Sequence, residues 1–189
     1  MDSADIYFTS AVQADTAQDK SDLYRQVAEG FKNAKNWAKS AQWYDKLVTA
    51  NPNTQTLDYF WRGAMYYYAT DYPHAATAFE QMETKYPDQP SATYWRGRVG
   101  AAMDPEGKDG TGVPFFVKWL GVVGDNYEKK NDLKIAEEYL VLYYYNKKDK
   151  VNEDIYKTKL RAIDPNDNLL KQIEDNEKVV TPKKPAGKK

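Results

Sequence analysis

The 189-residue sequence contains no cysteine and one histidine, His74. Without cysteine the chain forms no disulfide and holds no thiolate nucleophile, and a single histidine cannot supply the usual ligand set of a zinc site. No apolar stretch approaches the length of a membrane span. These absences exclude several common chemistries, and we expect His74 to be a solvated residue at the start of a helix.

Neither sign of charge is in large excess. The formal net charge is −1, and the segment from Thr181 onward carries four lysines and no acid, so the rest of the chain is mildly acidic. A nucleic-acid groove needs a basic stripe along one face. We therefore predict no nucleic-acid partner.

The sequence offers no convincing metal, phosphate or catalytic motif. The stretch 104–112 has acids where a calcium loop begins, but Lys108 and Phe115 stand where such a loop needs an acid and its final glutamate. Its glycines match no phosphate-loop spacing. The adjacent pairs Glu137-Glu138 and Glu153-Asp154 should diverge on a helix, and we expect them to lie on solvated faces. We predict no cofactor, no metal site and no catalytic residue.

A repeated pattern is present instead. Three stretches end in a similar way, with Ala50-Asn51-Pro52-Asn53, Lys85-Tyr86-Pro87-Asp88 and Ile163-Asp164-Pro165-Asn166. The first two prolines are 35 residues apart. A period of this length is typical of a stack of helical repeats.

The repeats fit a 34-residue frame with the proline at position 32. The first repeat then places apolar or aromatic residues at positions 4, 8, 11, 17 and 24, namely Tyr24, Ala28, Phe31, Trp37 and Tyr44. The second places Tyr59, Gly63, Tyr66, Tyr72 and Phe79 at the same positions. The chain therefore resembles the tetratricopeptide repeat (TPR) family. The resemblance implies an all-α, right-handed solenoid of antiparallel helix pairs that binds partners rather than catalysing reactions.

The frame divides the chain into units. We predict a half repeat at 1–18, repeats at 21–54, 55–88, 89–128 and 131–166, a capping helix at 167–180 and a disordered Lys/Pro tail at 181–189. The third repeat contains a long loop at 104–113, rich in glycine and proline, which we expect to be the most mobile internal segment. Gly63 and Gly97, both at position 8, should lie at close contacts between helices. The Trp61-Arg62 and Trp95-Arg96 pairs should hold the seams between repeats, with arginine stacked on a ring.

Several motifs narrow the resemblance. Trp95-Arg96-Gly97-Arg98, the 104–107 Asp-Pro-Glu-Gly loop and Pro114-Phe115-Phe116 are similar to the C-terminal part of envelope TPR proteins of Gram-negative bacteria. This resemblance implies an exported parent protein with a periplasmic or envelope location.

The chain begins with a helix that lacks its partner helix. Read on the same frame, Ala4, Phe8 and Val12 form the apolar face of a second helix without a first. We interpret this as the start of a piece of a longer solenoid; the alternative is a native N-terminal capping helix. An unpaired apolar face also makes self-association possible.

The inner groove of such a solenoid is lined by positions 2, 5, 9, 12 and 13 of each first helix. In the second to fourth repeats, positions 5, 9, 12 and 13 provide Phe60, Tyr67, Tyr68, Tyr94, Arg98, Leu142 and Tyr145. Tyrosine and arginine often dominate binding energy. We predict that these residues bind an unidentified protein or peptide, with no membrane insertion. The alternatives are that the rings pack as core, or that the chain is a self-assembling structural segment.

Overall fold

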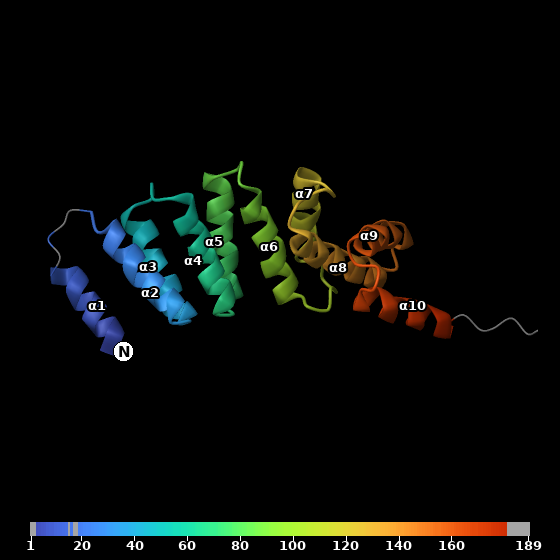
Figure 1. The fold of residues 1–189 in the computed structure, drawn as a ribbon, viewed down its shortest axis with the longest axis horizontal. Helices are drawn as coiled ribbons and strands as arrows, with labels where there is room; N and C mark the ends of the chain where they lie inside the picture. Colours follow the sequence, from blue (N-terminus) through green and yellow to red (C-terminus); the bar gives the residue numbers. More distant parts are fainter. Residues whose placement is uncertain (1–2, 15, 17–18, 181–189) are drawn as a thin grey trace, which may run out of the picture. The chain divides into compact units, whose positions relative to one another are not determined.

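The computed structural model describes residues 3–14, 16 and 19–180, and every regular element in that part of the chain is a helix (Figure 1). The chain divides into two compact units, Met1–Met103 and Asp104–Lys189. The boundary between the units lies inside the predicted third repeat. The predicted disordered tail lies outside the described residues.

The first unit contains six helices within the described residues. These are α1 (Ser3–Ala14), α2 (Ser21–Asn33), α3 (Trp37–Ala50), α4 (Thr56–Tyr68), α5 (Tyr72–Lys85) and α6 (Pro90–Met103). Short connections make consecutive helices antiparallel neighbours (Figure 1). The second unit contains α7 (Val113–Val123), α8 (Lys130–Lys147), α9 (Lys150–Ile163) and α10 (Asn168–Val180). The all-α prediction is confirmed.

One turn recurs between the two helices of a pair. Lys35, Thr70 and Lys148 each adopt a left-handed conformation, with φ of 57°, 59° and 57°. The next residue, Asn36, Asp71 or Asp149, accepts a hydrogen bond from the backbone N–H three positions later. This side-chain cap satisfies a donor of the new helix, so the sequence encodes each turn locally.

Proline marks the end of each pair. The helices α3, α5 and α9 end at Ala50, Lys85 and Ile163, and Pro52, Pro87 and Pro165 follow two residues later. Proline lacks the N–H that a continuing helix needs. The predicted register is confirmed at all three places.

The core of the first unit is aromatic and tightly packed. Trp43, Tyr44 and Phe79 are almost fully buried. Gly63 on α4 faces Phe79 on α5, and a Cβ at Gly63 would lie 2.7 Å from that ring. The close contact predicted for Gly63 is therefore present.

Arginines tie the helix pairs together through carboxylates. Arg62 donates to Asp45 at 2.5 Å, and Arg96 donates to Glu83 at 2.5 Å. Arg25 donates two hydrogen bonds of 2.9 Å to the buried Asp58. The seam role predicted for Arg62 and Arg96 holds, and carboxylates of the preceding helices provide contacts at both places.

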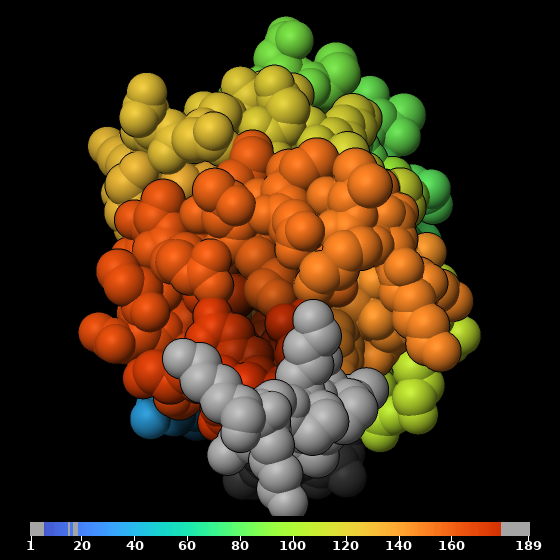
Figure 2. All heavy atoms as spheres, turned by 90° about the vertical axis from the view of Figure 1, so that its right-hand side faces the viewer, coloured from blue at the N-terminus to red at the C-terminus, as the bar shows by residue number. Residues whose placement is uncertain are grey.

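In the second unit, Phe116, Trp119 and Leu120 form the buried face of α7. A separate cluster joins α8, α9 and α10 through Val141, Leu160, Leu170 and Ile173. Figure 2 shows the face of the molecule on which α9 and α10, in orange and red, lie toward the viewer. Short helices of this kind are stabilised mainly by such apolar packing.

The 104–112 loop is held by a buried aspartate. Asp104 is 6% exposed and accepts hydrogen bonds from the backbone of Lys108, Asp109 and Gly110. It also accepts one from the Tyr139 hydroxyl at 2.7 Å. This dense bonding is that of an ordered loop and corrects the expectation of a mobile one.

Candidate functional site

A shallow hollow opens at the N-terminal ends of α4 and α6. It has a volume of about 310 Å³ and is lined mainly by apolar groups of Thr56, Leu57, Phe60, Met82, Gln89 and Ser91. Leu57 is 55% exposed at the rim of this hollow, so its side chain is accessible to a partner. An open apolar hollow of this size suits one side chain of a partner.

Aromatic rings continue from this hollow along α4. They surround Trp95 of α6, whose ring centroid lies 5.7 Å from Phe60, 5.2 Å from Tyr67 and 6.1 Å from Tyr68. All three contacts are edge-to-face, the arrangement that aromatic quadrupoles favour. Trp95 is buried at the centre of the cluster, and Tyr68 is 45% exposed at its margin.

Arg98 covers the far end of the aromatic cluster. Its guanidinium lies 4.6 Å from the centroid of Trp95 and 5.0 Å from that of Tyr67. Its single hydrogen bond is a long one of 3.4 Å to the Tyr67 hydroxyl. Stacking on aromatic faces orients the guanidinium and leaves its donors free for an acid.

The other arginines of the described residues are already paired with carboxylates. The acidic partners of Arg25, Arg62, Arg96 and Arg161 are Asp58, Asp45, Glu83 and Glu174. Arg98 has no such acid within the described part of the chain. Arg98 is half-buried, and its cation is not neutralised by a carboxylate of the described residues.

Asp58, the buried acid that binds Arg25, is not available to pair with Arg98. Burial by itself raises the pKa of Asp58, but hydrogen bonds from Arg25 and Thr54 outweigh burial and lower the pKa. Asp58 therefore stays ionised and bound to Arg25 at neutral pH.

The structure brings together only part of the predicted binding set. Phe60, Tyr67, Tyr68 and Arg98 lie on one face of α4 and α6. Tyr94 is 4% exposed, so it is a packing residue and its predicted role in contacting a partner is corrected.

Two predicted binding residues belong to the second unit. Tyr145 packs against the cluster that joins α8, α9 and α10. Leu142 is half-buried, and its Cγ would lie 3.1 Å from a Cβ added at Gly107. Both side chains support the packing of their own unit.

Sequence reasoning did not select Leu57 or Trp95 as binding residues. Leu57 stands at position 2 of the frame, another groove position, so the frame itself carried that signal. The sequence pattern places Trp95 at a seam, and it does not show that three rings and Arg98 gather around this side chain.

Two of the four acids expected on solvated faces are buried instead. Glu137 and Glu153 are 1% and 3% exposed, so that expectation is wrong for both. Glu153 is paired with Lys157 at 3.2 Å and Lys150 at 3.0 Å. Burial raises the pKa of Glu137 to about 7. Both side chains lie on the inner side of their helices, which periodicity alone did not reveal.

His74 lies where it was expected. It is exposed at the start of α5, 2.8 Å from Asp71 and stacked on Tyr66 at a centroid distance of 5.2 Å. In the described part of the chain, no three His, Cys, Asp or Glu side chains come together as a metal site. Nor does any helix there have the length and apolar character needed to cross a membrane.

Several solved structures resemble this chain in fold. The C-terminal part of a TPR repeat-containing protein from Cytophaga hutchinsonii is 29% identical, with a TM-score of 0.72 over 88% of this chain. The chain spans 64% of the length of that structure. MamA from Desulfovibrio magneticus RS-1, residues 41 to the end, is 16% identical with a TM-score of 0.66, over 85% of this chain and 86% of its own.

A third structure is that of YrrB, described as a TPR protein with an unusual peptide-binding site. It is 14% identical with a TM-score of 0.52, over 89% of this chain and 97% of its own. No profile of a known protein family matches the chain, and no curated protein sequence does so.

Helix pairs joined by one recurring turn define an all-α repeat protein. The solved relatives place the chain among TPR-like proteins.

Proposed function

We propose that this protein is a non-enzymatic interaction module whose first unit binds an acidic, apolar-containing peptide segment of a partner protein. The observation that carries the proposal is Arg98, which lacks an acidic partner among the described residues and covers the end of the aromatic cluster that lies away from the open apolar hollow. Aromatic rings and arginine are the residue types that most often dominate binding energy.

The distance between the apolar hollow and Arg98 sets the separation of the two side chains that the peptide needs. Leu57 and Tyr67 are ten residues apart on α4, so the hollow and Arg98 are separated by about 15 Å along the helix. An extended chain covers that distance in about four to five residues. The preferred peptide therefore carries an apolar side chain and a carboxylate at that separation.

Peptide selection tests this proposal. A displayed library of random peptides is selected against the whole protein, and the recovered peptides are titrated against the wild type and R98Q. We expect acidic residues four to five positions from an apolar residue, and about tenfold weaker binding to R98Q. The matched control is R161Q, which removes an exposed arginine in the second unit. Equal affinity of R98Q and the wild type overturns the assignment of Arg98.

A second candidate function is self-association through α1. Ile6 and Tyr7 are 51% and 72% exposed on this helix. Two adjacent exposed apolar side chains favour contact with another copy of the chain. Light scattering at increasing concentration tests this: the wild type should associate and Y7S should remain monomeric. A monomeric wild type removes this candidate.

An envelope location follows from the narrower resemblance. The parent protein would then be exported, and cell fractionation of its native host, followed by immunodetection, decides the question. Recovery with cytoplasmic markers contradicts the proposal. YrrB, whose description includes a peptide-binding site, supports the interaction role but not this location.

A further inference from the structure

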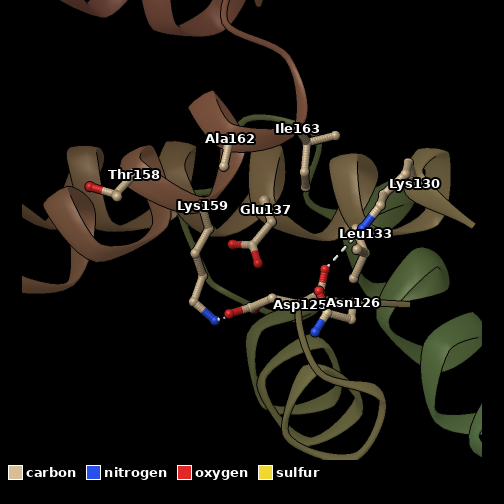
Figure 3. A pocket seen from close by; sticks show the side chains of 9 residues that line it. All are labelled: Asp125, Asn126, Lys130, Leu133, Glu137, Thr158, Lys159, Ala162 and Ile163. Carbon is tan, nitrogen blue, oxygen red and sulfur yellow. Dashed lines mark hydrogen bonds and ion pairs between the residues drawn. The ribbon is translucent and has the colours of Figure 1, made fainter. Parts of the chain in front are cut away.

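A pocket opens within the second unit, between α8, α9 and the segment that joins α7 to α8 (Figure 3). Its volume is about 500 Å³, and its lining residues are Asp125, Asn126, Lys130, Leu133, Glu137, Thr158, Lys159, Ala162 and Ile163. This volume lies in the range of small-ligand sites. All the lining residues belong to one unit.

The pocket contains a buried acid without a partner. Glu137 is 1% exposed, and its Oε2 atom is buried without a hydrogen bond. Its carboxyl group points into the space between Lys159 and Asp125 (Figure 3). Buried polar groups in proteins are nearly always hydrogen-bonded, so an orphaned carboxyl oxygen directed into a pocket indicates a missing donor.

The lysines nearest to this acid are engaged elsewhere. Lys159 Nζ lies 2.8 Å from the Asp125 carboxylate, and Lys130 Nζ donates to the Asp125 carbonyl at 3.0 Å. The dashed lines in Figure 3 mark these contacts at the mouth of the pocket. Both contacts are exposed to solvent, and exposed ion pairs contribute little free energy. A ligand that enters the pocket can therefore displace them at low cost.

The repeat frame explains why space exists at this place. Glu137 stands at position 4 of its repeat, where the first and second repeats have Tyr24 and Tyr59. Tyr59 is 5% exposed, so its ring fills the corresponding space. A glutamate is shorter and narrower than a tyrosine ring, and it leaves room for a ligand.

We propose that this pocket binds a primary alkylammonium group on an aliphatic stem, such as a lysine side chain. The stem contacts Leu133, Ala162 and Ile163, and the ammonium donates to Glu137. An ammonium supplies donors and the opposite charge together, which a neutral donor does not. This site is independent of the surface on the first unit.

The charged groups around Glu137 set the pH dependence. They are Lys130 on α8, Lys159 and Tyr156 on α9, and Asp125 in the connecting segment. Burial, the largest influence, raises the pKa of Glu137 to about 7; Lys159 opposes this shift and Asp125 adds to it. The ammonium binds the ionised carboxylate. Affinity should therefore rise with pH through this value and then level off, with a proton released on binding below it.

Titration calorimetry and NMR with Nα-acetyl-lysine amide test the proposal on the whole protein. The control ligand is Nα-acetyl-norleucine amide, which keeps the stem and lacks the cation. The test variant is E137Q, and the matched control is E138Q, which changes the adjacent acid outside the pocket. Circular dichroism establishes that both variants are folded. Butylamine serves as a second probe, because it separates a free amine from a lysine within a peptide.

We expect saturable binding of the lysine probe to the wild type and to E138Q, and about tenfold weaker binding to E137Q. Binding of both butylamine and the lysine probe indicates that a free amine suffices, and binding of the lysine probe alone indicates a partner's lysine; either result supports the site. No saturable binding, equal binding to E137Q, or equal binding of the norleucine probe overturns it. None of these outcomes depends on Arg98, so failure here leaves the proposed peptide surface untouched.

Discussion

At the scale of single residues, Gly63 shows how little space the first unit leaves between helices. A Cβ added at Gly63 lies 2.7 Å from the Phe79 ring, a distance that real contacts do not reach. The Phe79 ring is fully buried and packs against the rings of Phe60 and Trp95. We expect G63A to lower the free energy of unfolding by about 1–3 kcal/mol through overpacking. Chemical denaturation provides the measurement.

A second glycine supplies the control. Gly30 also lies inside a helix, and a Cβ added there meets no atom within 4 Å. Alanine favours the helix by roughly 0.5–1 kcal/mol over glycine at such a position. G30A should therefore stabilise the protein. If G63A and G30A changed stability in the same direction, the close contact at Gly63 would not be limiting.

At the scale of an element, the 104–112 loop depends on one carboxylate. Asp104 gathers three backbone N–H groups and the Tyr139 hydroxyl. Burial alone raises the pKa of Asp104, but these hydrogen bonds lower it overall. D104A leaves several donors unsatisfied, and we expect a loss of about 2–4 kcal/mol in the free energy of unfolding.

The exposed Asp109 in the same loop gives the matched variant. D109A removes a carboxylate of the same size without removing these hydrogen bonds, so its stability should stay within about 0.5 kcal/mol of the wild type. Thermal unfolding of both variants distinguishes a loop held by Asp104 from one held by backbone packing. Equal losses in the two variants would reject the anchor role of Asp104.

At the scale of the whole molecule, the two units should respond differently to pH. In the first unit, Asp58 has a lowered pKa, so its stabilisation is present above the unfolded value and is lost only as pH falls through the folded one. In the second unit, burial raises the pKa of Glu137 and of Glu138 to about 7. The folded state therefore binds these two protons more tightly than the unfolded state does. As a result, this unit is most stable in mild acid, and its free energy of unfolding falls as pH rises toward 7.

Between about pH 5 and pH 8 the second unit should lose on the order of 2 kcal/mol, while the first changes little. Pulse proteolysis with mass spectrometry separates the two units by their fragments. E137Q should flatten the pH dependence of the second unit in part, because Glu138 still titrates. A first unit that lost as much stability over the same range would contradict this assignment.

Local patterns in the sequence suffice to predict the helices and their ends. Capping residues such as Asn36 and Asp71, and prolines such as Pro52 and Pro87, act within a few residues of their own position, so a local pattern suffices to place them. The repeat frame also brought Phe60, Tyr67, Tyr68 and Arg98 to one face, because helical periodicity fixes which side chains share a face.

Packing between helices sets which of the predicted binding residues are accessible and which are buried. Tyr94 is buried and Arg98 lacks an acidic partner, and both facts depend on residues from other helices. The same holds for Glu137, whose position in the sequence resembles that of a solvated acid. Burial and pairing are set by contacts between distant segments, which one sequence does not specify. The candidate sites therefore emerged only when the helices were packed.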